Sequence, residues 1–168
     1  NLRDLATAIR DSGADLGLSM DGDADRAGAL SPQRLFSGND LATTIAYGTL
    51  KQDREAAGDA WDPQQYVIAR SIVSTAWIDA VASTFDMPEA NIRKTAVGFR
   101  FLNDAIRGAL DEGKRVIVAF EENGGIANEG AAYKDGFATD LKFLDLAARA
   151  KLEEQERDRL ERDERHDP

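Results

Sequence analysis

The stretch that decides the fold is GKRVIVAFEENGG, which runs from Gly113 to Gly125. Within it, Arg115 to Phe120 is a mostly apolar run rich in β-branched residues, and such a run predicts a buried strand. Two glutamates, an asparagine and two glycines follow at once, so polar groups lie directly after the strand. Because buried parallel strands are continuous apolar runs, the stretch favours a sheet that helices cover.

Helical and strand-like patterns alternate on both sides of this strand. Before it, helical spacing of apolar residues predicts a helix over 99–110; after it, a glycine-rich loop over 121–136 leads into a last helix. Further strands are predicted at 14–20, 27–30, 66–69 and 91–96, the last as an edge strand, and further helices at 1–12, 41–50 and 74–85. Alternation of this kind indicates an α/β fold with a mixed, largely parallel sheet flanked by helices.

The ends and faces of two helices can also be predicted. Asn39 or Asp40 is expected to cap the helix over 41–50, because either side chain can accept hydrogen bonds from free helix N–H groups. In the helix over 74–85, Trp77 is expected on the apolar face that packs against the sheet.

The last helix combines an apolar stripe with a charged end. Leu144, Ala148 and Leu152 lie at helical spacing and predict one stripe. Residues 151–168 are mostly charged, which predicts a solvated helix or a disordered tail. The single histidine, His166, lies within this tail and is expected to be solvated rather than catalytic.

Composition excludes several classes of protein. The chain has 168 residues, enough for one domain and part of another, and contains no apolar run long enough to span a membrane. A net charge of −10 argues against a nucleic-acid partner, which would need cations for its phosphates. The absence of cysteine excludes disulfides and thiolate metal sites, and it fits a reducing compartment, so we expect a cytoplasmic protein.

An acidic turn follows the first predicted strand, in LGLSMDGDADRAGAL over 16–30. Asp21, Asp23 and Asp25 occupy alternate positions with small residues between them, and Arg26 comes next. Three carboxylates this close repel one another unless a cation neutralises them. Mg²⁺ prefers oxygen ligands, so the turn predicts a magnesium site.

Three alternatives compete for the acidic turn. An EF-hand needs glycine at its sixth position and glutamate at its twelfth, where this chain has Arg26 and Pro32, so it is excluded. An aspartyl-phosphate phosphatase would use Asp21 as nucleophile and a later lysine, and none of the lysines after the predicted strands is placed convincingly. The third alternative is a solvated acidic turn that binds nothing.

With its preceding strand, DGDADR resembles the metal-binding loop of the α-D-phosphohexomutases, the phosphoglucomutase and phosphomannomutase superfamily. Later stretches match in the same order. VIARSIVSTAWIDAVA resembles the opening of the third domain, KTAVGFRFLNDAI the T-P-V-G-F-K-Y-I segment, VAFEENGGI the G-E-E-S-G-G sugar loop and KDGFATDLKFLDLA the K-D-G-I helix. The resemblance therefore implies the end of a second domain in 1–36, a sugar-binding third domain in 37–150 and a tail in 151–168.

The resemblance also implies an activity. Family members are isomerases that move a phosphoryl group between C1 and C6 of a hexose phosphate. The motif E-E-N-G-G at 121–125 favours glucose 1- or 6-phosphate as the substrate. A phosphoserine loop and a phosphate clamp take part in the family, and neither T-A-S-H nor R-x-S-G-T-E-P is found here. We therefore expect one part of a larger mutase, inactive alone, with the other domains in cis or in trans. A non-catalytic remnant that binds metal or sugar phosphate, or serves as a partner subunit, is the alternative.

Site residues follow from the resemblance by position. It implies that Asp21, Asp23 and Asp25 hold Mg²⁺, that Arg26 acts catalytically on the transferring phosphate, that Glu121 and Asn123 contact sugar hydroxyls, that Arg70 lines the cleft and that Gly98 shapes the pocket near the phosphate. Arg26 has a second possible role, which is to pair with the aspartates of its own turn. Phe120 replaces the usual glycine of the sugar loop and Asn123 the usual serine, which leaves the preference between hexoses open.

Overall fold

The structure is a computed structural model that describes residues 2–164 of the chain. In chain order its elements are α1 (Leu2–Ser12), β1 (Gly17–Met20), β2 (Ala27–Leu30), β3 (Leu35–Phe36), α2 (Gly38–Ala57), β4 (Tyr66–Ser71), α3 (Trp77–Thr84), β5 (Ile92–Thr95), α4 (Phe99–Asp111), β6 (Arg115–Phe120), β7 (Ile126–Asn128) and α5 (Gly136–Glu164). Short 3₁₀ turns precede β4 and β5. The predicted alternation of helices and strands is confirmed from α2 to β6.

The main sheet has the strand order β5-β4-β6-β7. Strands β5, β4 and β6 are parallel and β7 is antiparallel, so the sheet is mixed and largely parallel, as predicted. β5 lies at the edge, also as predicted. The short strand β7 was not expected, because it lies within the stretch whose glycines predicted only a loop.

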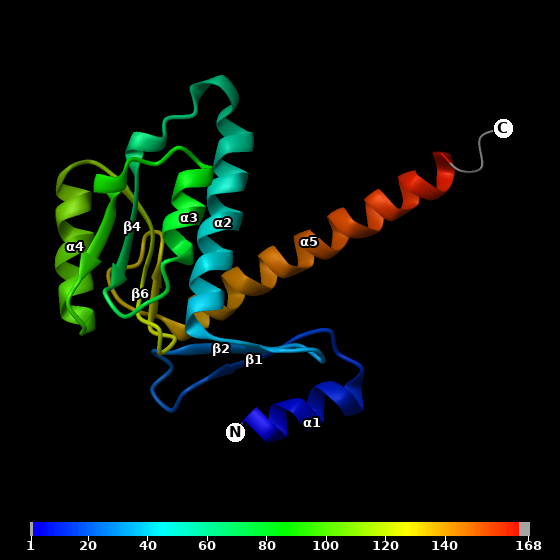
Figure 1. Cartoon of the computed structure of the whole chain (residues 1–168). Helices are drawn as coiled ribbons and strands as arrows, with labels where there is room; N and C mark the ends of the chain where they lie inside the picture. Colours follow the sequence, from blue (N-terminus) through cyan, green and yellow to red (C-terminus); the bar gives the residue numbers. More distant parts are fainter. Residues whose placement is uncertain (1, 165–168) are drawn as a thin grey trace.

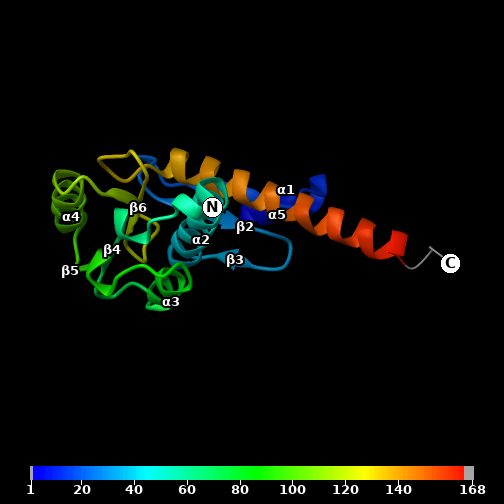
Figure 2. The same ribbon diagram turned by 90° about the horizontal axis from the view of Figure 1, so that it is seen from above.

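Helices cover both faces of the main sheet (Figures 1 and 2). One face packs against α4 through a smaller apolar cluster, formed by Val67, Ala69, Leu102, Ile106, Ala109, Val116, Ala119 and Ala127. The other face supports the larger core, to which α2, α3 and α5 contribute Leu41, Ile45, Ile78, Ala82, Phe143 and Leu146. These layers hold the carboxyl ends of β4 and β6 in fixed positions, where polar side chains follow both strands.

A second, smaller sheet carries the acidic turn. Its order is β1-β2-β3 and all its pairs are antiparallel. α1 packs on β1 and β2, while α5 and α2 contact β2, so helices enclose this sheet too (Figure 1). β3 was not expected, since its sequence has the composition of a turn.

Two predictions about helix ends and faces are wrong. α2 begins after Ser37, whose hydroxyl accepts from the Asp40 N–H, while the Asp40 carboxylate accepts from the Ser37 N–H. This capping box makes Asp40 the third helical residue instead of the cap. Trp77 is 77% exposed, because α3 begins at that residue and buries the face that contains Ile78 and Ala82.

The stripe predicted on α5 exists but faces away from the core. Leu144 and Leu152 are exposed, whereas Phe143 and Leu146 are buried against the larger core. α5 then continues beyond the body of the molecule as a charged helix (Figure 1). His166 lies outside the described residues. None of the helices that the structure describes has the length and apolar character needed to cross a membrane.

Candidate functional site

The acidic turn connects β1 to β2, and its carboxylates converge. One oxygen each from Asp21, Asp23 and Asp25 lies within 4.8 Å of the other two. Ala24 adopts a positive φ of 57°, which folds the turn back so that alternate side chains point to one place. Asp23 is exposed, and the other two aspartates are half-buried. The turn therefore presents three hard oxygen donors at a common point.

Arg26 pairs with the aspartates of its own turn. Its Nε lies 2.5 Å from Asp21 Oδ2 and 3.7 Å from Asp25 Oδ1. Asp21 Oδ1 accepts from the backbone N–H groups of Asp25 and Arg26, both at 3.2 Å. Desolvation acts to raise the pKa of Asp21, but the hydrogen bonds and charge of Arg26 outweigh it and hold that pKa below its usual value. Asp21 is therefore a carboxylate at neutral pH.

Lys134 is a second cation at the turn, and sequence reasoning did not place it there. Its Nζ lies 2.6 Å from Asp25 Oδ2 and 5.7 Å from the centre of the Phe99 ring. The available signal was the KDG stretch, in which this lysine is the first residue. Only the fold could bring that stretch to the acidic turn, because the two lie far apart in sequence.

Backbone contacts join the acidic turn to the main sheet through a glycine seam, which we define as Gly38, Gly124 and Gly136. The Gly136 N–H donates to the Ala24 carbonyl at 2.9 Å, and the Ala27 N–H donates to the Gly124 carbonyl at 3.0 Å. A Cβ on Gly124 would lie 2.6 Å from the Ala27 oxygen. Gly38 packs directly behind the Gly124 backbone. Side chains larger than hydrogen would separate these segments.

The stretch after β6 forms a tight turn beside the acidic one. Buried Glu121 accepts the Gly98 N–H at 2.9 Å through Oε1, which joins two of the predicted site residues. Gly98 has a φ of 120°, a conformation that favours glycine. Asn123 Oδ1 accepts the Gly125 N–H at 2.9 Å, which fixes that side chain over its own turn.

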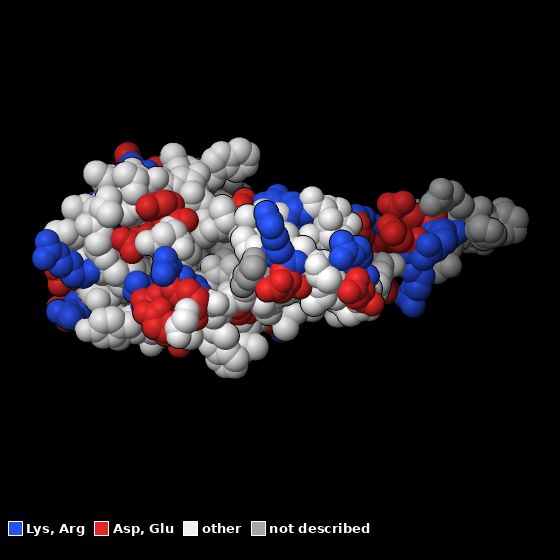
Figure 3. Space-filling view, turned by 90° about the horizontal axis from the view of Figure 1, so that it is seen from below, with Lys and Arg blue, Asp and Glu red and all other residues white. Residues whose placement is uncertain are grey.

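Both turns line one hollow in the surface. Its volume is about 340 Å³, and it is lined by Leu2, Ser19, Met20, Asp21, Arg26, Ala27, Gly28 and Asn123. Acidic side chains gather on this face with basic ones beside them (Figure 3). The fold thus brings Asn123 next to the acidic turn, and Glu121 and Gly98 support the loop that carries it.

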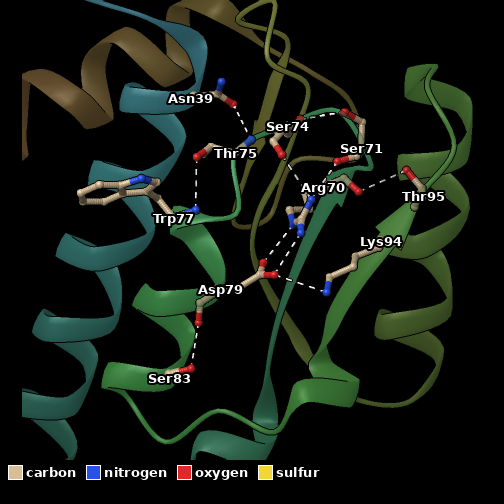
Figure 4. Close-up of polar contacts among 10 residues, drawn as sticks. All are labelled: Asn39, Arg70, Ser71, Ser74, Thr75, Trp77, Asp79, Ser83, Lys94 and Thr95. Carbon is tan, nitrogen blue, oxygen red and sulfur yellow. Dashed lines mark hydrogen bonds and ion pairs between the residues drawn. The ribbon is translucent and has the colours of Figure 1, made fainter.

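Arg70 is held apart from this hollow. It is only 6% exposed, and its Nε and Nη2 donate to the two carboxylate oxygens of Asp79 at 2.9 and 3.0 Å (Figure 4). Its Nη1 donates to the carbonyl oxygens of Ser71 and Ser74, each at 3.3 Å. Hydrogen bonding from Arg70 holds the pKa of Asp79 low. The guanidinium therefore joins β4 to α3.

Comparison with known families decides the affiliation. Residues 37–162 match the sequence model described as phosphoglucomutase/phosphomannomutase, alpha/beta/alpha domain III. The chain belongs to the phosphoglucomutase/phosphomannomutase family. This membership confirms the resemblance seen in the sequence and agrees with the helix-covered, largely parallel sheet.

Curated relatives in the family are longer proteins. The chain is 31% identical over 142 residues to a phosphomannomutase of Mycoplasma pneumoniae, an alignment that covers 80% of this chain and 24% of the relative. It is 26% identical over 137 residues to human glucose 1,6-bisphosphate synthase, covering 78% of this chain and 22% of that protein. The chain thus spans about a quarter of the length of the relatives it matches.

Solved structures of the family share the fold. A phosphoglucomutase/phosphomannomutase family protein from Burkholderia thailandensis superposes with a TM-score of 0.70 at 18% identity, over 89% of this chain and 29% of the other. The phosphoglucomutase parafusin from Paramecium gives a TM-score of 0.60 at 21% identity, over 89% of this chain and 25% of the other. At these identities the likeness supports the architecture alone.

Proposed function

We propose that this chain is the metal-binding and sugar-recognition part of a phosphohexomutase, an isomerase that transfers a phosphoryl group between C1 and C6 of a hexose phosphate. The observation that carries the proposal is the shared hollow, which is lined by Asp21, one of three convergent carboxylates, and by Asn123 of the neighbouring turn. Family membership supplies the reaction class. The phosphoserine that exchanges the phosphoryl group lies outside these residues in this proposal, on other domains supplied in cis or in trans.

The donor set fits Mg²⁺. Three carboxylate oxygens within 4.8 Å of one another are hard ligands of the kind that this ion prefers, and Asp21 is ionised at neutral pH. Bound there, the ion would neutralise charge on the transferring phosphoryl group. Arg26 lies at the same point and can donate to a phosphate oxygen in addition to Asp21.

Recognition of the sugar belongs to the turn after β6 in this proposal. Asn123 faces the hollow and can both donate to and accept from hydroxyl groups. Glu121 accepts the Gly98 N–H through Oε1, and in this proposal its other carboxylate oxygen accepts from a sugar hydroxyl. We assign residues 1–36 to the metal-loop domain, 37–150 to the sugar-binding domain and 151–168 to a tail, and we place the protein in the cytoplasm.

A calorimetric Mg²⁺ titration of this chain tests the metal site. Asp23→Asn removes one charged ligand with little change in size, so the affinity should fall on the order of tenfold or more, as losses at metal sites do. Asp59→Asn removes an exposed acid from a different loop and serves as the control, with unchanged binding. Equal affinity in the wild type and Asp23→Asn would exclude the acidic turn as the site.

Activity distinguishes the mutase proposal from its alternative. The altered sugar loop, with Phe120 and Asn123, favours a non-catalytic remnant that binds metal or sugar phosphate. If the mutase proposal holds, the purified chain converts no glucose 1-phosphate alone and does so once the missing domains are added. Turnover by the chain alone would contradict the proposal that the phosphoserine lies on other domains. Absence of turnover with the complementary domains present would support the non-catalytic alternative.

A further inference from the structure

Two cations pair with the acidic turn in this structure. Arg26 binds Asp21 from within the turn, whereas Lys134 binds Asp25 from the segment that precedes α5. Arg26 directly follows Asp25 in the sequence, so it would remain near the turn in any conformation. Lys134 reaches it only because the folded protein places it there.

The position of Lys134 is built by its surroundings. The next residue, Asp135, donates its N–H to the Ile126 carbonyl of β7 at 2.9 Å. Gly136 donates to the Ala24 carbonyl of the acidic turn, so the backbone on one side of Lys134 is bound at both sheets. The stem of Lys134 runs along Gly125, where an added Cβ would lie 3.1 Å from Lys134 Cδ. A freely rotating surface lysine has none of these restraints.

We propose that Lys134 is a positioning residue that holds Asp25 while the turn is without a dication and releases it when the dication binds. The inference rests on the proposed magnesium site. Asp25 Oδ2 is 2.6 Å from the ammonium, so the lysine competes with a dication for the charge of this carboxylate. The ammonium then lies beside a dication, where like charges repel. After release, the nearby face of Phe99 offers the ammonium a favourable contact.

Lys134→Gln removes the competing charge and preserves most of the stem. Since a partly exposed ion pair of this kind is weak, the Mg²⁺ affinity of the variant should rise only about threefold to tenfold. The matched control is Lys51→Gln, which breaks the 2.8 Å ion pair between Lys51 of α2 and Glu153 of α5. The two lysines are similarly exposed, at 27% and 36%, and the control should leave Mg²⁺ affinity unchanged.

Thermal unfolding gives a second measurement that needs no activity. In EDTA, Lys134→Gln should melt at a lower temperature than the wild type, because Asp25 has lost the nearer of its two cations. In saturating Mg²⁺ this difference should disappear, because the wild-type lysine no longer holds Asp25. A lysine that only stabilises the fold would lower the melting temperature equally in both buffers, and that result overturns the proposal.

The outcomes separate this inference from the proposed function. Mg²⁺ binding by the wild type with equal or weaker binding by Lys134→Gln overturns the role of Lys134 and leaves the metal site intact. Absence of Mg²⁺ binding in both overturns the metal site itself. Lys134→Arg preserves the positive charge, so it should melt like the wild type in EDTA; it keeps the proposal testable if the glutamine variant fails to fold.

Discussion

At the scale of single residues, Asp140 is a carboxyl group enclosed by the protein. It is 4% exposed on the buried face of α5, and its Oδ1 has no hydrogen-bond partner among the residues that the structure describes. Burial raises its pKa from 3.8 to about 7, because the charged form is poorly solvated there. The side chain is therefore largely protonated below neutral pH.

Asp140 makes stability depend on pH. The folded protein binds this proton more tightly than the unfolded chain, so the stabilisation is complete below pH 4 and is lost as pH rises to about 7. Asp140→Asn cannot ionise, so at pH 8 its free energy of unfolding should exceed that of the wild type by on the order of 2–4 kcal/mol. Urea denaturation measures this as a higher midpoint concentration. Exposed Asp145→Asn on the same helix is the control. An identical dependence on pH in Asp140→Asn and the wild type would contradict this origin.

Residues differ in how far their roles could be predicted. The convergence of Asp21, Asp23 and Asp25 was predictable, because side chains at alternate positions of one short turn can point to a common centre. Lys134 and Asp140 were not, because their surroundings come from segments far away in sequence. Arg70 lies near the carboxyl end of a strand, as a ligand-binding arginine would, and only the position of Asp79 shows where its donors point.

At the scale of elements, the glycine seam predicts that alanine substitutions at different glycines will differ in their effect on stability. Gly38 begins α2 against the backbone of Gly124, so neither segment can rotate away from an added Cβ. Gly38→Ala should therefore destabilise the protein by about 1–3 kcal/mol, the usual range for overpacking. Gly22→Ala in the acidic turn, where an added Cβ meets nothing within 4 Å, is the control. Equal melting temperatures for the two variants would show that the seam can expand.

The elements that sequence predicts well are those with strong periodicity. β6 and α4 have it, and both begin where expected. β3 and β7 contain two and three residues, too few for any period, and they exist because neighbouring strands offer partners. On α5, Leu144 follows the buried Phe143, so the apolar pattern alone does not reveal which face meets the core.

At the scale of the whole molecule, local sequence patterns do not predict the division into two sheets, because no local pattern says which strands will pair; only the family resemblance separated 1–36 from 37–150. The carboxyl-terminal part of α5 projects away from both sheets (Figure 1). Lys51 pairs with Glu153 at 2.8 Å and Asp15 with Lys151 at 2.6 Å, all on the surface. These contacts are weak, because water and salt screen exposed charges.

Removing residues 153–168 should therefore change the free energy of unfolding by less than about 1 kcal/mol. The Lys51–Glu153 ion pair that it breaks is exposed, as is the Glu156–Arg159 pair within the segment, and no residue of the described core clusters is removed. Chemical denaturation of the shortened chain measures this directly, with Glu153→Gln as a variant that breaks the same pair alone. A loss of more than about 3 kcal/mol would mean that the helix end supports the folded body.

The glycine seam also limits how this protein can adapt to ligands. A main-chain hydrogen bond from the Ala27 N–H to the Gly124 carbonyl joins the acidic turn to the turn of Asn123, so in the proposed function the distance between the metal ion and the sugar would be fixed. If the chain binds a hexose phosphate as proposed, ligands of different length could not be accommodated by spreading the two turns. Under the proposed function, tolerance for ligand size would therefore have to come from lining residues outside the two turns, such as Leu2 and Ser19.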